Sequence, residues 1–287
     1  MSAFPTGVQA NYVPEIFSKK LLARFKEQTI LESVTNTDYQ GEISGQGSKV
    51  IIRHSPEVDI NDYAGADLTY GLLGEGTTEL VIDRAKYYSF RDEDVHAAQR
   101  DIKQFISEAT KNAADNMRIA VEKDVFGSVY ADAAHQMNSG GGTPGALTIG
   151  KNDVIDLIVD TNVRFDEENI PRDGRFLILP AWACGLIRKS DLKDASITGD
   201  STGVIRSGMV GSVDGTMIYS SNCLAETGGG FHALAGTKHA TSFASQFVNN
   251  EKGRLEKRFG DYYRGLKVYG FKVVKPECLI DVWVKKA

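Results

Sequence analysis

The segment from Gly145 to Asn152, GALTIGKN, comes closest in this sequence to a phosphate-binding loop. In such a loop the lysine is followed by a serine or threonine whose hydroxyl binds Mg²⁺, and a buried strand precedes the first glycine. Here Asn152 stands in the place of the hydroxyl residue, and the polar stretch SGGGTP precedes Gly145. We therefore interpret this segment as a glycine-rich linker that ends in a helix N-cap at Asn152.

The segment Gly199–Gly203, GDSTG, has the spacing of a nucleophile elbow, and Asp214 and His232 follow it in the order that α/β-hydrolases use. That chemistry requires a strand before the serine and a helix after it. The flanking segments RKSDLKDASIT and VIRSGMVG favour neither element. The sequence therefore predicts a surface loop around Ser201 rather than a catalytic triad.

Metal and cofactor sites have no better support. No two histidines are four residues apart, and none lies in a cluster with metal-ligand spacing; the five are His54, His96, His135, His232 and His239. The run Asp92–Asp94 fits the first turn of a helix, where the helix dipole favours carboxylates. Gly45 and Gly47 lack the third glycine of the dinucleotide fingerprint, because Val50 stands there. We predict no catalytic residue, no metal ligand and no cofactor.

The composition narrows the class of protein. The 287 residues are 41% hydrophobic and 25% charged, which is typical of a globular chain with a sizeable core. A net charge of −5 argues against a dedicated nucleic-acid-binding surface. Three cysteines without a Cys-x-x-Cys pair argue against disulfides or structural zinc and favour a reducing cytoplasm. The N-terminus does not resemble a signal peptide, and the apolar run Phe176–Ile187 is shorter than the roughly 20 residues of a membrane span.

The first third of the chain is predicted to be extended. Residues 1–40 form an arm, with apolar residues at helical spacing after Pro14. Residues 41–91 contain many glycines and two strand-like pieces, KVIIRHSPEV and TELVID, which predict a long β-ribbon. Because an isolated two-stranded ribbon is marginal in water, this ribbon needs a partner surface.

A long helix is predicted from Asp92 to Phe126, since apolar residues recur there at steps of three and four. Ser89 and Asp92 would form its capping box, and the small residues Ala109 and Ala113 would face the C-terminal strands.

Residues 138–151 are predicted to be a flexible connection to a compact α/β region, residues 151–247. There we expect a helix from Asn152 or Asp153 to Phe165, a strand in RFLILP, a helix from Ala181 and a turn-rich β region over 204–221. The strands after Arg254 are expected to return and pack under the long helix.

The order of these parts resembles the major capsid protein of tailed bacteriophages, which has the Hong Kong 97-type fold. Three segments carry the resemblance: Asn11–Leu22, Ile170–Pro180 and Arg264–Pro276. The resemblance implies an α+β fold. It divides the chain into an N-terminal arm (1–40), an extended loop or E-loop (41–91), a P-domain with the spine helix (92–150), an inserted A-domain (151–247) and returning P-domain strands (248–287).

The resemblance also implies a function. The chain would be a structural protein, not an enzyme, forming hexamers and pentamers of an icosahedral shell around double-stranded DNA without sequence-specific binding. Its partners would be other copies of itself, a portal protein, a separate scaffolding protein, since only about 40 residues precede the ribbon, and a decoration protein. It would lie in the virion capsid after assembly in the host cytoplasm, with no membrane contact. Lys49 lacks the context of the family's cross-linking lysine, and no cross-link is carried over.

Two other functions stay open at this point. One is an encapsulin, a cellular shell of the same fold around an enzyme. The other is an oligomeric hydrolase or nucleotide-binding enzyme built on residues 145–240.

Charge predicts how neighbouring copies would contact each other. Residues 41–83 hold eight acidic and two basic residues, a net charge of −6, whereas residues 251–287 hold ten basic and five acidic residues, a net charge of +5. We therefore expect the acidic ribbon of one copy to lie over the basic C-terminal strands of the next.

Overall fold

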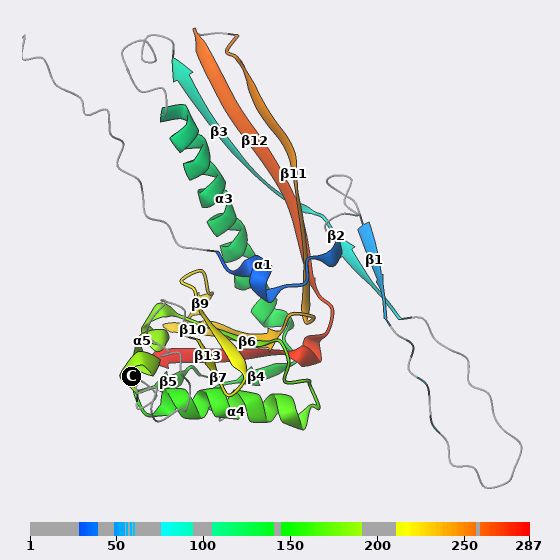
Figure 1. Ribbon diagram of the computed structural model, residues 1–287, viewed down its shortest axis with the longest axis vertical. Coiled ribbons are helices and arrows are strands. Elements are labelled where there is room, and N and C mark those ends of the chain that lie inside the picture. Colours follow the sequence, from blue (N-terminus) through cyan, green and yellow to red (C-terminus); the bar gives the residue numbers. More distant parts are fainter. Residues whose placement is uncertain are drawn as a thin grey trace, which may run out of the picture.

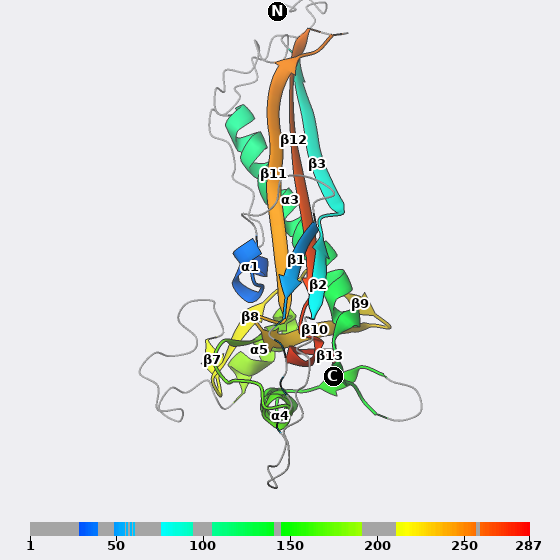
Figure 2. The ribbon, with the colours of Figure 1, turned by 90° about the vertical axis from the view of Figure 1, so that its right-hand side faces the viewer.

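The computed structural model describes residues 29–39, 49–54, 56, 58, 60, 76–93, 105–140, 145–190, 211–256 and 259–287. These residues form an elongated three-stranded sheet beside a long helix, an eight-stranded sheet with two helices, and a two-stranded ribbon (Figure 1). The eight-stranded sheet lies at one end of the elongated sheet in both views (Figures 1 and 2). Among the described helices, none is both long and apolar enough to cross a bilayer.

The elongated sheet consists of β11 (Thr241–Arg254), β12 (Gly260–Val273) and β3 (Arg84–Glu93), in the order β11-β12-β3 with antiparallel neighbours. Helix α3 (Phe105–Val129) runs along one face of it (Figure 1). Successive side chains of a strand point to opposite faces. On β12, one set of side chains therefore faces α3 and the alternate set faces away from it.

The predicted start of the long helix at Asp92 is wrong. Asp92 and Glu93 are the last residues of β3, where they pair with β12, and Ser89 lies in the same strand rather than in a capping box. Pairing along ten residues of β12 outweighs the local preference of an acidic run for a helix start. Helix α3 is described from Phe105 and ends at Val129, three residues beyond the predicted end.

The face of the elongated sheet opposite α3 carries the ribbon at one end. β1 (Lys49–Arg53) and β2 (Thr77–Val81) pair antiparallel, which confirms the predicted ribbon over these residues. The buried side chains of the ribbon pack against Val268 and Ala244 of the sheet.

Gly270 allows the ribbon to cross the sheet closely. A Cβ at this position would collide with the backbone carbonyl oxygen of Val81 in β2. Leu80 and Ile82 are completely buried at this crossing. The crossing is therefore a tight contact that a larger residue at position 270 would push apart.

The eight-stranded sheet has the order β4-β13-β10-β6-β8-β7, with β5 beside β13 and β9 beside β10. Its strands are β4 (His135–Met137), β5 (Leu147–Ile149), β6 (Arg175–Leu179), β7 (Ser212–Val213), β8 (Thr216–Ser220), β9 (Glu226–Thr227), β10 (Gly230–Thr237) and β13 (Leu279–Lys286). Helices α4 (Asp153–Glu167) and α5 (Ala181–Lys189) contribute to the core on one face. The predicted helix from Asp153, the strand in RFLILP and the helix from Ala181 are confirmed.

Two predictions about this sheet need correction. Residues 147–149, predicted as part of a flexible connection, form β5 and pair in parallel with β13. The return of the C-terminal strands to α3 holds for β12 but not for β13, which pairs with β10 and β4. β13 takes this central place because nearly all of its residues from Leu279 to Val284 are buried.

The two sheets share one apolar core where they meet. The end of α3 supplies Val125, Phe126 and Val129, and the one-turn helix α1 (Leu31–Val34) inserts Leu31 and Val34 beside them. The arm helix predicted after Pro14 lies outside the described residues. Short 3₁₀ turns, η2 (Tyr130–Asp132) and η4 (Pro276–Cys278), follow α3 and precede β13.

Candidate assembly surfaces

The segment that resembles a phosphate-binding loop lies between the eight-stranded sheet and α4. The Asp153 carboxylate accepts a hydrogen bond from the backbone N–H of Gly150 (2.9 Å). A fixed negative charge therefore uses a donor that a phosphate would need. Asn152 is the N-cap of α4 by position, as predicted, although its side chain makes no capping hydrogen bond.

Asp214 and His232 of the hydrolase-like motif have separate partners. Ser201 and the rest of Gly199–Gly203 lie outside the described residues. Asp214 lies in the turn between β7 and β8, where its carboxylate accepts a hydrogen bond from the Asn162 amide (3.0 Å). His232 instead bonds Asp281 on the neighbouring strand (2.9 Å).

The other histidines also have separate surroundings. The His54 ring shares a hydrogen bond with the Thr78 hydroxyl in the ribbon (2.7 Å), and His135 lies 3.3 Å from the Glu168 carboxylate. His239 is exposed in the turn between β10 and β11, whereas His96, Gly45 and Gly47 lie outside the described residues. In the part of the chain that the structure describes, no three potential metal ligands gather.

His232 and Asp281 form a closed internal pair. The His232 ring is stacked between Tyr130 (centroids 4.0 Å apart) and Trp283 (5.4 Å apart). The side chains of His232 and Asp281 are only 9% and 3% exposed. Burial raises the pKa of Asp281 above its usual value, and the hydrogen bond and charge of His232 offset this only in part. The pair ties β10 to β13 as part of the core.

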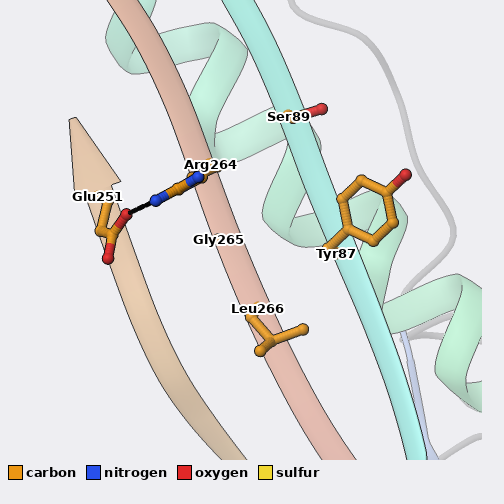
Figure 3. A pocket seen from close by; sticks show the side chains of 6 residues that line it. All are labelled: Tyr87, Ser89, Glu251, Arg264, Gly265 and Leu266. Carbon is orange, nitrogen blue, oxygen red and sulfur yellow. Dashed lines mark hydrogen bonds and ion pairs between the residues drawn. The ribbon is translucent and has the colours of Figure 1, made fainter. Parts of the chain in front are cut away.

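An open groove lies on the elongated sheet, on the face opposite α3. Figure 3 shows its lining side chains in front of the strands, with α3 behind them. The groove has a volume of about 480 Å³ and is lined by Tyr87, Ser89, Glu251, Arg264, Gly265 and Leu266. Tyr87 is 76% exposed, and Leu266 packs against the core under the ribbon. The groove therefore begins where the chain's own ribbon stops covering this face.

The ribbon presents apolar side chains to solvent. Ile51 points away from the sheet and is 60% exposed, and beyond the strand Val58 and Ile60 are 65% and 97% exposed. Single exposed apolar residues are ordinary, but three on one short segment make it a candidate contact surface. The ribbon and the groove are the two surfaces in the described chain best suited to an assembly contact.

Part of the charge on these surfaces is paired within the chain. Arg264 donates to Glu251 (Nε to Oε2, 2.7 Å), and Lys252 and Arg254 both contact Asp261. The ribbon has its own pair, Lys49 with Glu79 (2.9 Å). The net charges of the two segments remain, but fewer free cations face a neighbour than the sequence count implies.

Known structures settle the fold. Over 95% of its length the chain matches a protein of Mycobacterium phage Che8, with 25% identity, a TM-score of 0.76 and 97% of that chain covered. It matches the capsid of cyanophage P-SCSP1u over 99% of its length (96% of that chain), with 18% identity and a TM-score of 0.72. The capsid of an empty GTA particle matches over 99% (100% of that chain), with 11% identity and a TM-score of 0.69. The protein has the phage capsid fold.

The capsid fold confirms the α+β, Hong Kong 97-type architecture that the sequence predicts. No protein-family model matches the chain, and the search of curated proteins found no relative. The structural matches cover nearly all of both chains.

Sequence reasoning missed the groove at the level of residues. The segment RAKYYSFRDE lacks the unbroken apolar–polar alternation that would have indicated a half-buried strand. In the structure it is β3, which places Tyr87 and Ser89 on one face.

Proposed function

We propose that the chain is a major capsid protein, many copies of which form hexamers and pentamers of an icosahedral shell around double-stranded phage DNA. The observation that carries this proposal is the match of almost the whole chain to capsid structures, with no large segment left over for another activity. Assembly would take place in the host cytoplasm, with a portal, a separate scaffolding protein and a decoration protein as further partners.

In this proposal each structural part has a role in the shell. The arm comprises residues 1–40, and the β1–β2 ribbon is the base of the extended loop. The elongated sheet with α3 is the P-domain, and the eight-stranded sheet is the A-domain. The A-domain then takes in β4, β5 and β13, which lie outside the sequence range 151–247.

The extended loop of one copy would cover the groove of the next. The exposed Val58 and Ile60 supply apolar surface, and Tyr87 and Leu266 supply a matching floor. Burying apolar area stabilises a contact by about 25 cal/mol per Å². Three of the C-terminal cations, Lys252, Arg254 and Arg264, are already paired within the chain, and an exposed ion pair contributes only about 0–1 kcal/mol. Apolar contact therefore provides most of the affinity, and net charge mainly fixes the orientation.

Electron microscopy of the purified full-length protein tests the function. Closed shells, or rings of five and six subunits, are the expected result, and a monodisperse small oligomer at every concentration contradicts the proposal. Double-stranded DNA inside particles from infected cells distinguishes a phage capsid from an encapsulin, whose shells would hold an enzyme instead.

The docking contact has its own test, Tyr87→Ala. Truncating a buried aromatic anchor costs about 1–3 kcal/mol of interface energy, so the concentration needed for assembly should rise at least several-fold. Tyr88→Phe is the control, because Tyr88 is the next residue of β3, its side chain lies on the opposite face of the strand, and the variant should assemble as the parent does. Equal assembly of the two variants, both with unchanged unfolding of the unassembled chain, would remove the groove from the interface and leave the capsid function intact.

A further inference from the structure

Glu122 is a fully buried carboxylate in the C-terminal half of α3. A buried charge is costly unless hydrogen bonds compensate for it, so its donors reveal what it holds in place. One carboxylate oxygen accepts hydrogen bonds from the backbone N–H groups of Ile30 (2.7 Å) and Leu31 (3.2 Å). The other oxygen accepts a hydrogen bond from the Ser221 hydroxyl (3.0 Å).

The carboxylate and its donors come from three separate parts of the chain. Ile30 and Leu31 open α1, which is the described end of the arm, while Glu122 belongs to the long helix beside the elongated sheet. Ser221 follows β8 in the eight-stranded sheet, where its backbone N–H donates to Leu179 and its hydroxyl accepts from the Cys223 N–H. One side chain thus joins arm, helix and second sheet.

The other contacts of the arm segment do not fix where the chain leaves this junction. Leu31 and Val34 insert into the shared core, and such apolar contact has little directional preference. Asn36 forms a backbone bridge with Ser242, exchanging hydrogen bonds with its neighbours Thr241 and Phe243, but this holds the far end of the segment. The Ile30 carbonyl accepts a hydrogen bond from the Ser33 N–H within α1 (2.9 Å), whereas the bond from the Ile30 N–H to Glu122 connects this backbone to another part of the chain.

We propose that Glu122 is a three-way joint that couples docking of arm residues 30–36 to the position of the eight-stranded sheet relative to α3. If either the arm or the Ser221 loop moves, the carboxylate loses a donor that a buried charge needs, so the remaining bonds weaken as well. The arm and the second sheet would therefore shift together rather than independently. This inference concerns the unassembled chain and does not depend on shell formation.

Amide hydrogen exchange on the unassembled full-length protein tests the joint. Glu122→Leu keeps the side chain large but removes both acceptors, so exchange at Ile30 and Leu31 should accelerate about tenfold or more. Exchange at Cys223 should accelerate with it. Asp124→Asn, two residues along the same helix, is the matched control, because Asp124 bonds Arg84 and Tyr269 instead, and exchange at Ile30 should stay within about twofold of the parent.

The coupling itself is tested by Ser221→Ala, which touches neither Ile30 nor Leu31. A joint predicts faster exchange at both of these amides, by about threefold, because the carboxylate has lost one of its donors. Unchanged exchange at Ile30 and Leu31 in this variant overturns the coupling, and unchanged exchange in Glu122→Leu overturns the joint altogether. If Glu122→Leu does not fold, the Ser221→Ala result alone decides the proposal.

Discussion

The two sheets of this protein differ in how completely one chain covers them. In the eight-stranded sheet, β6 is buried at every position and β13 at five of its eight positions, with α4 and α5 over one face and the end of α3 near the other. In the elongated sheet, α3 covers one face while the ribbon covers only part of the other and leaves the groove beside Tyr87. The first sheet is covered on both faces within one chain, whereas the second has an open face that we propose a neighbouring copy covers.

This difference explains why the two regions need different tests. Substitutions inside the eight-stranded sheet should destabilise the isolated chain, since its core has no outside contribution. Substitutions on the open face of the elongated sheet should leave the isolated chain folded and change assembly. A substitution at Gly270, where the ribbon crosses the sheet, should change both the stability of the isolated chain and its assembly.

The largest loss of folding stability is expected from Phe165→Ala in the core under α4. Phe165 is completely buried, and the Arg175 guanidinium lies over its ring (5.2 Å to the centroid). Such a truncation costs about 3–5 kcal/mol, which urea unfolding of the unassembled chain would measure. Val163→Ala on the outer, half-exposed side of the same helix should cost less than about 0.5 kcal/mol. Similar losses in the two variants would contradict the closed core.

A smaller effect is expected from Gly270→Val, which pushes the ribbon away from the sheet. The new side chain collides with the Val81 carbonyl, and overpacking of this kind costs about 1–3 kcal/mol. Because the ribbon is also the proposed docking element, assembly should weaken more than unfolding does. Gly127→Ala in α3 is the control, because a Cβ there contacts nothing and should stabilise the helix by about 0.5–1 kcal/mol. A neutral Gly270→Val would show that the crossing is loose.

The smallest effects are expected from two carboxylates, one in each region, whose pKa values shift in opposite directions. Burial alone would raise the pKa of Asp124, but hydrogen bonds from Tyr269 and Arg84 outweigh it and the pKa lies below the usual value. The stability that Asp124 provides is therefore present above its unfolded pKa of about 3.9 and is lost as the pH falls through the folded value.

The pKa of Asp281 shifts in the opposite direction to that of Asp124. Its pKa is raised by burial, so its contribution is present below the unfolded pKa and is lost as the pH rises through the folded value. Relative to the parent, Asp124→Asn should lose stability as the pH rises towards about 4, whereas Asp281→Asn should gain stability as the pH rises above about 4. Urea unfolding between pH 3 and pH 7 measures both slopes, and slopes of the same sign would contradict the assignment.

The sequence predicted the closed region better than the open one, for a physical reason. The strand RFLILP and the amphipathic helix from Asp153 can each be predicted from their own residues. A continuous apolar run fits a buried strand, and a 3.6-residue period of apolar residues fits a helix with one buried face. The resemblance then supplied the order of parts. β13 was misplaced because an apolar strand such as CLIDVWV fits either sheet, and only pairing with β10 decides between them.

The elongated sheet was harder to predict, because its strands are defined by pairing between residues far apart in the sequence. The acidic residues Asp92 and Glu93 look like a helix start, yet β12, about 170 residues later in the chain, holds them in a strand. The groove combines residues from β3, β11 and β12, so no single segment could reveal it. Glu122 was hidden as well, because it falls among the buried positions of a helix whose partners lie about 90–100 residues away.

The most direct test of the central claim is a cryo-electron-microscopy map of the assembled particle at side-chain resolution. The claim predicts density from the extended loop of a neighbouring copy over Tyr87 and Leu266, with the apolar residues near Ile60 inside the groove. A closed shell in which this groove faces solvent in every subunit would contradict it.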